Sequence, residues 1–330
     1  MSSAIHLSSD RLRRLLHDAV AVAQRAAVFR IAGPGALDCL QGLLTNDLIR
    51  PGDDHLVYGA LLTQKGMILS DAWVLRRRRD GLLWIAPQTR REETLALFSR
   101  SLPPRLAKVS DETERLAVIT VHGPRALASV QGVLDSVPAE AGQVIEVPSS
   151  HGPILVARAP DTAPFRLLLA VPVEEVGPLL ERMAHAGLPA GDESDSEAAR
   201  ILAGWPAVGA EIDDRTLPQE VRYDAIDAVS YSKGCYVGQE TVARIHFRGH
   251  PNRELRGLVW PGVSAPGALV QGAEGREVGV VSSVLALPGR NLGLVKIRRE
   301  VLEAGDGEVQ AGGAAARLVA LPFGPEEVAA

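Results

Sequence analysis

Two stretches of this 330-residue chain repeat one another without a gap, and this repeat constrains the fold more than any other feature. Residues 28–44 (VFRIAGPGALDCLQGLL) align with residues 118–134 (VITVHGPRALASVQGVL), so that Gly33 matches Gly123 and Gln41 matches Gln131. A shared register over this length indicates a duplicated structural unit. We therefore expect two related halves.

Each copy of the repeat has the composition of a strand, a turn and a helix. A β-branched run predicts the strand, glycine turns the chain, and proline presets the backbone at the first helical position. In the first copy Ala36, Leu40 and Leu44 give an apolar helix face, and Cys39 lies beside it. We interpret Cys39 as a core residue, because a buried free cysteine behaves as a small hydrophobe.

Further strand-like runs follow each copy, and a helix candidate ends each half, near residues 89–101 and 173–186. This order predicts two α+β lobes with mostly antiparallel sheets. From Arg253 onward, short apolar runs are divided by glycine and proline, which predicts a small β-barrel or sandwich. The strand-like runs are 58–63, 68–75, 82–86, 154–157, 165–171, 255–260, 278–284, 292–297 and 316–321.

The N-terminal segment has a helical rather than a strand period. Apolar residues recur from Leu12 to Ala23 with arginine and aspartate between them, and Ser9 is a plausible N-cap. The sequence therefore predicts one helix through Ala23, laid against the domain, rather than the core of a signal peptide.

Composition excludes several classes of function. The formal net charge is −5 and the pI is about 5.9, which disfavours direct nucleic-acid binding. Two cysteines make no disulfide framework, and alone they cannot hold a structural zinc ion or a four-thiolate cluster. We expect no dedicated metal site and, since no apolar stretch has membrane-spanning length, a cytoplasmic protein without a membrane partner.

Residues 229–240 (VSYSKGCYVGQE) form the segment in which chemistry is most expected. Lys233 places a cation two residues from Cys235, and a neighbouring cation favours the reactive thiolate. Gly234 and Gly238 permit close backbone approach and unusual φ angles. From these residues alone, a reactive cysteine and a tight turn with an incidental cysteine are equally acceptable interpretations.

The run from Lys233 to Glu240 resembles the hallmark motif of the YgfZ-like proteins, the folate-binding branch of the glycine-cleavage aminomethyltransferase superfamily. The resemblance extends through most of the chain and is weaker at about 130–200 and after 300. The other matching stretches are 40–47, 63–71, 204–220, 244–249 and 275–283.

The resemblance implies a fold of three subdomains around a central opening that binds a tetrahydrofolate or a derivative. We expect a first α+β lobe over residues 1–110, a second lobe with the cysteine motif over 111–250, and a β-barrel over 251–330. The resemblance also implies that the two lobes exchange segments and that the barrel closes the ring.

It further implies roles for individual residues. Cys235, Lys233 and Asp71 are the expected catalytic residues. An acid in the stretch 63–71 handles the folate in the aminomethyltransferases; here Asp71 is that acid, and Ser70 stands where a neighbouring acid would be. A purely structural Asp71 is the alternative. The expected cofactor-binding residues are Gly234, Tyr236, Gly238, Gln239, Glu240, Arg244 and Arg253.

Two features qualify the folate assignment. Leu202 occupies the place of an acid in the family, and a leucine cannot anchor a pterin by hydrogen bonds. Glu211, Glu220 or Asp71 would then substitute, or folate binding is weak or altered. Arg244, Arg248 or Arg253 could pair with the carboxylates of a folate's glutamate tail, and a solvated strand face is the alternative. We interpret His246 as structural rather than as a metal ligand.

Three functions remain open at the level of sequence. The favoured one is a folate-binding accessory protein in iron–sulfur cluster assembly or repair, which acts on client proteins or cluster carriers through Cys235 and supports tRNA modification indirectly. The alternative is a tetrahydrofolate-dependent aminomethyltransferase or demethylase, for which the shared fold is weak evidence. The third is a passive binding module with a structural Cys235.

Overall fold

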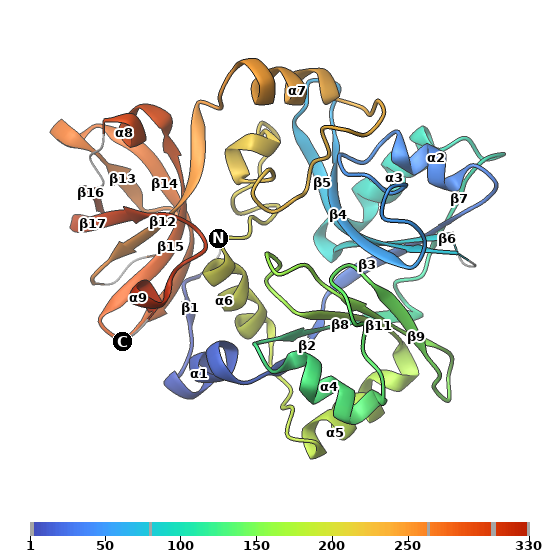
Figure 1. Cartoon of the computed structure of the whole chain (residues 1–330). Coiled ribbons are helices and arrows are strands. Elements are labelled where there is room, and N and C mark those ends of the chain that lie inside the picture. Colours follow the sequence, from blue (N-terminus) through green and yellow to red (C-terminus); the bar gives the residue numbers. More distant parts are fainter. Residues whose placement is uncertain (1–2, 79–80, 263–264, 305–307, 329–330) are drawn as a thin grey trace.

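The structure is a computed structural model that describes residues 3–78, 81–262, 265–304 and 308–328. Two five-stranded sheets and a seven-stranded sheet form three bodies around the middle of the molecule (Figure 1). The α+β class, the mostly antiparallel sheets and the C-terminal barrel are therefore confirmed. The ring-like arrangement also agrees with the expectation from the resemblance.

The first sheet, drawn in blue and cyan, has the strand order β4-β5-β6-β3-β7 and is antiparallel throughout (Figure 1). Helices α2 and α3 cover its outer face. The elements are β3 Ala26–Ala32, α2 Ala36–Gln41, β4 His55–Leu62, β5 Ile68–Arg77, β6 Gly81–Pro87, α3 Arg91–Ser101 and β7 Lys108–Asp111, with a 3₁₀ turn at Gln88–Arg90.

The second sheet repeats this design in the order β2-β8-β11-β10-β9, with α4 and α5 on its outer face. One strand of this sheet does not come from the second half of the chain. Strand β2 (Val20–Gln24) precedes the first lobe in the chain, yet it pairs with β8. The remaining elements are β8 Leu116–His122, α4 Ala126–Leu134, β9 Val144–Val147, β10 Ile154–Arg158, β11 Leu167–Pro172 and α5 Val176–His185, with a 3₁₀ turn at Val173–Glu175.

The two equivalent glycines of the repeat have the same structural role, a turn after the strand, in both halves. Gly33 and Gly123 have positive φ angles of 141° and 91°. A Cβ atom on Gly33 would lie 2.4 Å from the carbonyl oxygen of Leu106, and one on Gly123 would lie 2.4 Å from that of Asp18. The turn thus requires glycine. The sequence predicts Pro34 and Pro124 at the first helical position. The helices begin two residues later, at Ala36 and Ala126, so this prediction is wrong by two residues.

Both faces of each five-stranded sheet are buried, and the inward faces form the surroundings of the site. Strand side chains alternate between the faces, so Val74 and Trp84 pack under α2 and α3 while Trp73 and Ile85 face inward. The second sheet likewise turns Leu168 toward the inside. The inward faces of both sheets share one hydrophobic cluster, so the duplicated halves meet over a common core.

The predicted N-terminal helix is wrong in its second half. Helix α1 covers only Ser9–His17 and is capped by Ser8 rather than Ser9. Val20 and Val22 lie in β2 and are fully paired with β8. Strand pairing and burial of β-branched residues override the helical spacing here.

The C-terminal barrel closes because β14 pairs with both β13 and β15. Six strands form the ring, and the short β1 (Ile5–His6) adds to β14 in parallel. The elements are β12 Arg253–Trp260, β13 Leu269–Gln271, β14 Glu277–Leu287, β15 Arg290–Arg298, α8 Arg299–Glu303, β16 Glu308–Ala311, β17 Ala314–Val319 and α9 Pro325–Val328, with a 3₁₀ turn at Ala273–Gly275.

Two further helices connect the lobes to the barrel. Helix α6 (Glu193–Ala203) begins with an Asp192 capping box and contacts β2 on one side and β14 and β15 on the other. Helix α7 (Gln239–Arg248) follows the cysteine motif and leads into the barrel (Figure 1). A 3₁₀ turn at Pro218–Val221 lies between them in the chain. Within the described ranges, no helix is both long and apolar enough to span a membrane.

Candidate functional site

A cavity of about 270 Å³ lies where the inward faces of the two sheets meet α6. We call it the central cavity. The first sheet contributes Tyr58, Asp71 and Trp73, and the second sheet contributes Thr120 and His122. The segment Trp205–Val208 after α6 closes one side. The duplication thus creates the cavity, since neither half alone encloses it.

Aromatic rings form much of the cavity wall. The rings of Trp73 and Trp205 are stacked, with centroids 5.6 Å apart and an angle of 16° between their planes. Tyr58 packs against Trp205 at 4.8 Å, and Phe165 packs edge-on against Trp73 at 5.0 Å. Such walls suit a flat ring that can lie against them.

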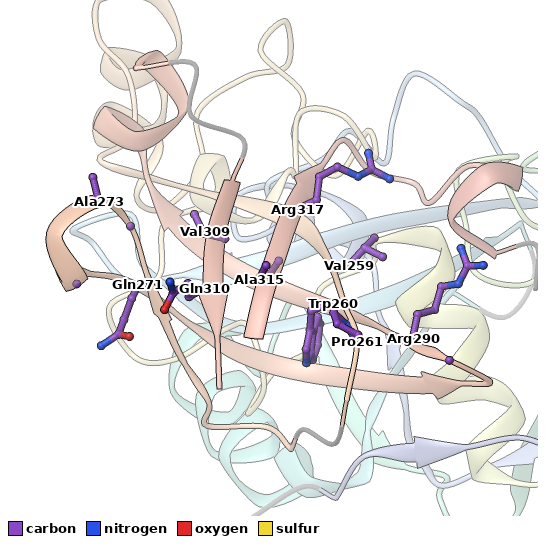
Figure 2. A pocket seen from close by; sticks show the side chains of 14 residues that line it. Val259, Trp260, Pro261, Gln271, Ala273, Arg290, Val309, Gln310, Ala315 and Arg317 are labelled. Carbon is purple, nitrogen blue, oxygen red and sulfur yellow. The ribbon is translucent and has the colours of Figure 1, made fainter. Parts of the chain in front are cut away.

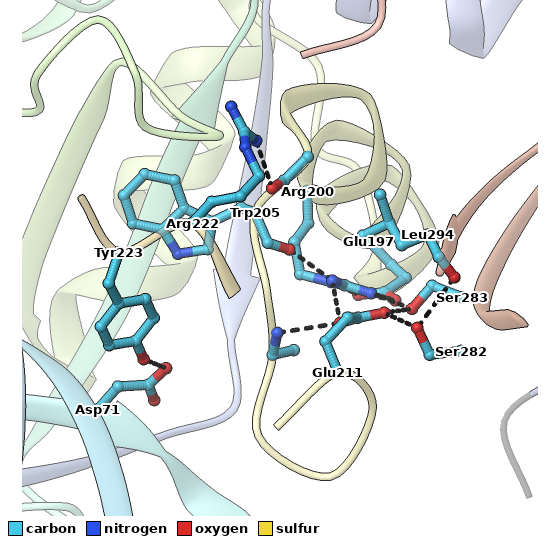
Figure 3. Close-up of polar contacts among 12 residues, drawn as sticks. Asp71, Glu197, Arg200, Trp205, Glu211, Arg222, Tyr223, Ser282, Ser283 and Leu294 are labelled. Carbon is cyan, nitrogen blue, oxygen red and sulfur yellow. Dashed lines mark hydrogen bonds and ion pairs between the residues drawn. The ribbon is translucent and has the colours of Figure 1, made fainter. Parts of the chain in front are cut away.

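Asp71 is the buried acid of this cavity. Both tyrosine hydroxyls donate to its Oδ2 atom, Tyr58 at 2.7 Å and Tyr223 at 3.1 Å; Figure 3 draws the Tyr223 contact. Burial raises the pKa of Asp71, and the two hydroxyls oppose this by stabilising the carboxylate. The neighbouring Ser70 instead pairs with Thr94 of α3 at 3.3 Å. The sheet alternation therefore leaves Asp71 facing the cavity.

The opposite wall carries an uncharged polar cluster. Gln24 Nε2 donates to Thr120 Oγ1 at 2.7 Å and to Ser196 Oγ at 2.6 Å. His122 Nε2 lies 2.8 Å from Thr120 Oγ1 and 3.1 Å from Ser196 Oγ, and its Nδ1 lies 2.8 Å from the carbonyl oxygen of Pro164. Burial lowers the pKa of His122 to about 4, so the ring is neutral at physiological pH.

Arg200 of α6 also lines the cavity, but its donors are used inside the protein (Figure 3). It donates to Glu211 at 2.9 Å, to Glu197 at 2.7 Å and to Ser283 at 2.6 Å, and also to the Trp205 carbonyl oxygen. This network joins α6 to the barrel.

Three acids are candidates to substitute for the acid that the resemblance expects at the place of Leu202, and only one of the three faces the cavity. Glu211 is fully buried and bonded to Arg200 and to the hydroxyls of Ser282 and Ser283. Glu220 accepts from the backbone of Leu217 at 3.0 Å and closes the 3₁₀ turn. Leu202 itself packs with the cluster at the barrel. Of the three acids, Asp71 is the one that lines the cavity.

Cys235 lies elsewhere, on an exposed loop. Lys233 anchors this loop, because its Nζ donates to the carbonyl oxygens of Gln41, Leu44 and Asn46 at 2.6, 2.7 and 2.8 Å. Burial lowers the pKa of Lys233 to about 8, so the amine remains largely protonated at neutral pH. The contacts of Lys233 are thus those of an anchor that holds the loop while the thiol faces solvent.

Gly238 fixes the other end of the loop. Its φ angle is +83°, and a Cβ atom there would lie 2.5 Å from the carbonyl oxygen of Thr63 and 3.1 Å from Cα of Gly66. The segment 63–66 and the cysteine motif therefore cross in close contact. This crossing is the physical reason for the glycines at positions 66 and 238.

Replacing Gly238 with alanine is expected to lower the free energy of unfolding by ~2 kcal/mol or more, because it combines backbone strain with a steric clash. Gly234→Ala is the matched control, since a Cβ atom at Gly234 meets no other atom within 4 Å. Urea unfolding of both variants measures the difference. Equal stability of the two would contradict the crossing described above.

The other predicted cofactor-binding residues lie on this loop, on α7 and on β12. Tyr236 is half-buried, and its backbone N–H donates to Gln239 Oε1 at 3.0 Å. Glu240 and Arg244 are exposed on α7, and Arg253 is exposed on β12. In the part of the chain that the structure describes, none of these, nor Gly234, Gly238 or Cys235, lines the central cavity. Their cofactor-binding role stays a prediction.

His246 agrees with its structural interpretation, since its ring stacks on Tyr231 with centroids 3.6 Å apart. Among the described residues, no group of three or more histidine, cysteine, aspartate or glutamate side chains is arranged to hold a metal ion.

A larger hollow of about 820 Å³ lies on the barrel (Figure 2). Its two arginines already have partners: Arg317 pairs with Glu327, and Arg290 donates to the carbonyl oxygens of Glu326 and Glu327. Small side chains and glycines supply much of the rest of its wall. We therefore place the site in the smaller, aromatic cavity.

Sequence reasoning missed several cavity residues. Gln24 and the exposed Arg25 directly follow the wrongly predicted helix. Trp205 of the cavity wall and Tyr223, which donates to Asp71, come from irregular segments. Trp205 and Tyr223 lie in or near the stretch 204–220 that matched the family, which was the available signal. For Gln24, no pattern in the sequence marked its place in the second sheet.

Comparisons with known proteins agree with this fold. The family model described as the GCVT N-terminal domain matches residues 19–230. An aminomethyltransferase from Rubrobacter xylanophilus is 28% identical over 319 residues, covering 92% of this chain and 84% of that protein. The tRNA-modifying protein YgfZ of Serratia proteamaculans is 27% identical over 284 residues, covering 84% and 83% of the two chains.

The same protein from Escherichia coli O157:H7 is 27% identical over 266 residues, covering 79% of each chain. Among solved structures, the glycine cleavage system aminomethyltransferase T from Bartonella henselae superimposes with a TM-score of 0.77 at 19% identity, over 96% of this chain and 89% of that one. The last likeness concerns the fold alone. On the extent of the family match, this chain belongs to the family of the GCVT N-terminal domain, as a YgfZ-like member.

Proposed function

We propose that this protein binds a reduced folate in its central cavity and acts in the cytoplasm as an accessory factor in iron–sulfur cluster assembly or repair. In this proposal Cys235 is the working group toward client proteins or cluster carriers, and support of tRNA modification is indirect. The observation that carries the proposal is the exposed thiol on a loop that Lys233 and Gly238 hold in place, outside the cavity.

The cavity supports the folate part of the proposal. Trp73 and Trp205 offer flat apolar surface to a pterin ring, and the Asp71 carboxylate can accept hydrogen bonds from pterin N–H groups. Arg25 is exposed at the cavity and is a cation that could pair with the glutamate tail. The sequence offers Arg244, Arg248 or Arg253 for that role, and they remain candidates.

The loop supports the accessory part. A single thiolate cannot hold a cluster without other ligands, so any cluster contact would need thiolates from a partner. An exposed cysteine on an anchored loop is accessible to such a partner. Two of the similar proteins are named as tRNA-modifying proteins. We propose that this effect passes through an iron–sulfur client, because the chain carries a net charge of −5 and has no broad basic field for RNA.

The second candidate is a tetrahydrofolate-dependent aminomethyltransferase or demethylase. A buried acid in an aromatic cavity favours it, since Asp71 could take part in proton transfer. It leaves the exposed, anchored thiol without a role, because one-carbon transfer to folate needs no thiol.

A binding and turnover experiment separates the two functions. Calorimetric titration with tetrahydrofolate is expected to give saturable binding by the wild type. Incubation with tetrahydrofolate and an aminomethyl donor is expected to give no methylene-tetrahydrofolate above a blank. Turnover that survives Cys235→Ala would overturn the accessory function in favour of the enzyme, whereas absent binding would overturn the folate part.

A further inference from the structure

The hydrogen positions in the Gln24 cluster follow from its geometry. The Pro164 carbonyl oxygen can only accept, so the Nδ1 atom of His122 carries the proton and Nε2 is a bare acceptor. Thr120 and Ser196 each have one hydroxyl hydrogen, and both hydroxyls lie within hydrogen-bond distance of that Nε2 atom.

The amide of Gln24 completes this arrangement. When the two hydroxyl hydrogens share the single lone pair of His122 Nε2, each hydroxyl oxygen is free to accept, and Gln24 Nε2 donates to both. The same nitrogen also lies 3.5 Å from the carbonyl oxygen of Val22, a longer and weaker contact. The two amide hydrogens are then used, and the amide orientation is fixed. Within the described residues, Gln24 Oε1 accepts no hydrogen bond, and Gln24 is a half-buried residue of the cavity wall.

We propose that Gln24 determines ligand specificity by accepting a hydrogen bond at Oε1 from a ring N–H group of the bound molecule, with Thr120, Ser196 and His122 as its positioning residues. This inference rests on the proposed function, in which the ligand is a reduced folate. It adds that Gln24 recognises a ring N–H group of that ligand.

The rest of the cavity points to the same chemical class. Asp71 presents a second acceptor on the first sheet, opposite the cluster on the second sheet. Arg200 has its donors directed to protein acceptors. A ligand matched to this cavity is therefore a flat ring that carries N–H donors on more than one edge. The pterin ring of tetrahydrofolate has this pattern, with its amino group and several ring N–H groups.

The test uses two substitutions of Gln24 in the full-length protein and titration with tetrahydrofolate. Gln24→Leu removes the acceptor and is expected to weaken binding about tenfold, the effect of one lost hydrogen bond. Gln24→Glu keeps an acceptor at the same reach, because Thr120 and Ser196 can turn their hydroxyls toward the carboxylate. It is expected to bind within about threefold of the wild type.

Gln131→Leu, at an exposed position on α4 of the same lobe, is the matched control and should bind as the wild type does. For the positioning role, Thr120→Val should weaken binding while Thr120→Ser restores it. The inference is overturned if Gln24→Leu binds like the wild type, or if Gln24→Glu loses as much affinity as Gln24→Leu. If the wild type does not bind tetrahydrofolate at all, the proposed function fails and the inference fails with it.

Discussion

Glu211→Ala is expected to lower the free energy of unfolding by about 3–5 kcal/mol, the range for removing one partner of a buried ion pair. Glu211 is fully buried and accepts from Arg200, from Ser282 and Ser283, and from the backbone of Ala207. Its loss leaves the Arg200 guanidinium buried without its main countercharge. Because these contacts join α6 to the barrel, the substitution should also loosen the docking of the barrel.

Urea unfolding followed by far-ultraviolet circular dichroism and by tryptophan fluorescence measures this effect. Glu240→Ala, at an exposed position of α7, is the control and should change stability by less than ~0.5 kcal/mol. Glu211→Gln keeps the shape and some hydrogen bonds and should fall between the two. A loss below ~1 kcal/mol for Glu211→Ala would match an exposed pair instead and would contradict the role assigned to this network.

The second large effect concerns Asp71. Asp71→Asn is expected to weaken tetrahydrofolate binding about 10- to 100-fold, since a hydrogen bond to a charged acceptor contributes ~1.5–3 kcal/mol. Asparagine has the same size and can still accept from Tyr58 and Tyr223. It then turns its amide N–H groups, rather than an oxygen, toward the N–H groups of the ligand.

Titration of the purified variants with tetrahydrofolate checks this expectation. Asp227→Asn is a suitable control, because Asp227 is an exposed acid in the wall of a different hollow and has a φ angle of 54° that asparagine tolerates. An Asp71→Asn variant that binds as tightly as the Asp227→Asn variant would remove Asp71 from the ligand's contacts.

Much of the fold could be predicted because its strongest signals are local. The strand, turn and helix of the repeat lie within 17 consecutive residues, and the turn glycines are required by backbone approach in both copies. The helical spacing up to Ala23 failed because β2 is held by pairing with β8, a partner about 100 residues away in the chain. A local period carries no information about such a partner.

The same distinction between local signals and distant partners explains which parts of the site could be predicted. Asp71 lies in a stretch with a recognisable pattern, and the strand period then places it on the inward face. The contacts of Lys233 could not be predicted, because its three carbonyl partners lie nearly 200 positions earlier in the chain. The chemical role of Lys233 that its proximity to Cys235 predicts stays a prediction, while its contacts are those of an anchor.

Leu202, which the resemblance places where relatives carry an acid, also has a structural context. Leu202 packs at the barrel, and Phe323 donates its backbone N–H to the Leu202 carbonyl oxygen at 3.0 Å. Glu211 and Glu220 are bonded within the protein, so they do not fill the place of that acid. In the proposed complex, the polar contacts of the pterin ring should therefore come from Asp71 and from Gln24.

The central claim is that Cys235 performs the function, and complementation tests it most directly. A bacterial strain that lacks its own YgfZ-type protein would receive the wild type, Cys235→Ala or Cys39→Ala, with iron–sulfur enzyme activity and thiomethylated tRNA as readouts. Cys39 is the matched control because it is partly buried and packs against the core of the first lobe. The account predicts that the wild type and Cys39→Ala restore both readouts while a folded Cys235→Ala restores neither; restoration by Cys235→Ala equal to the wild type would contradict it.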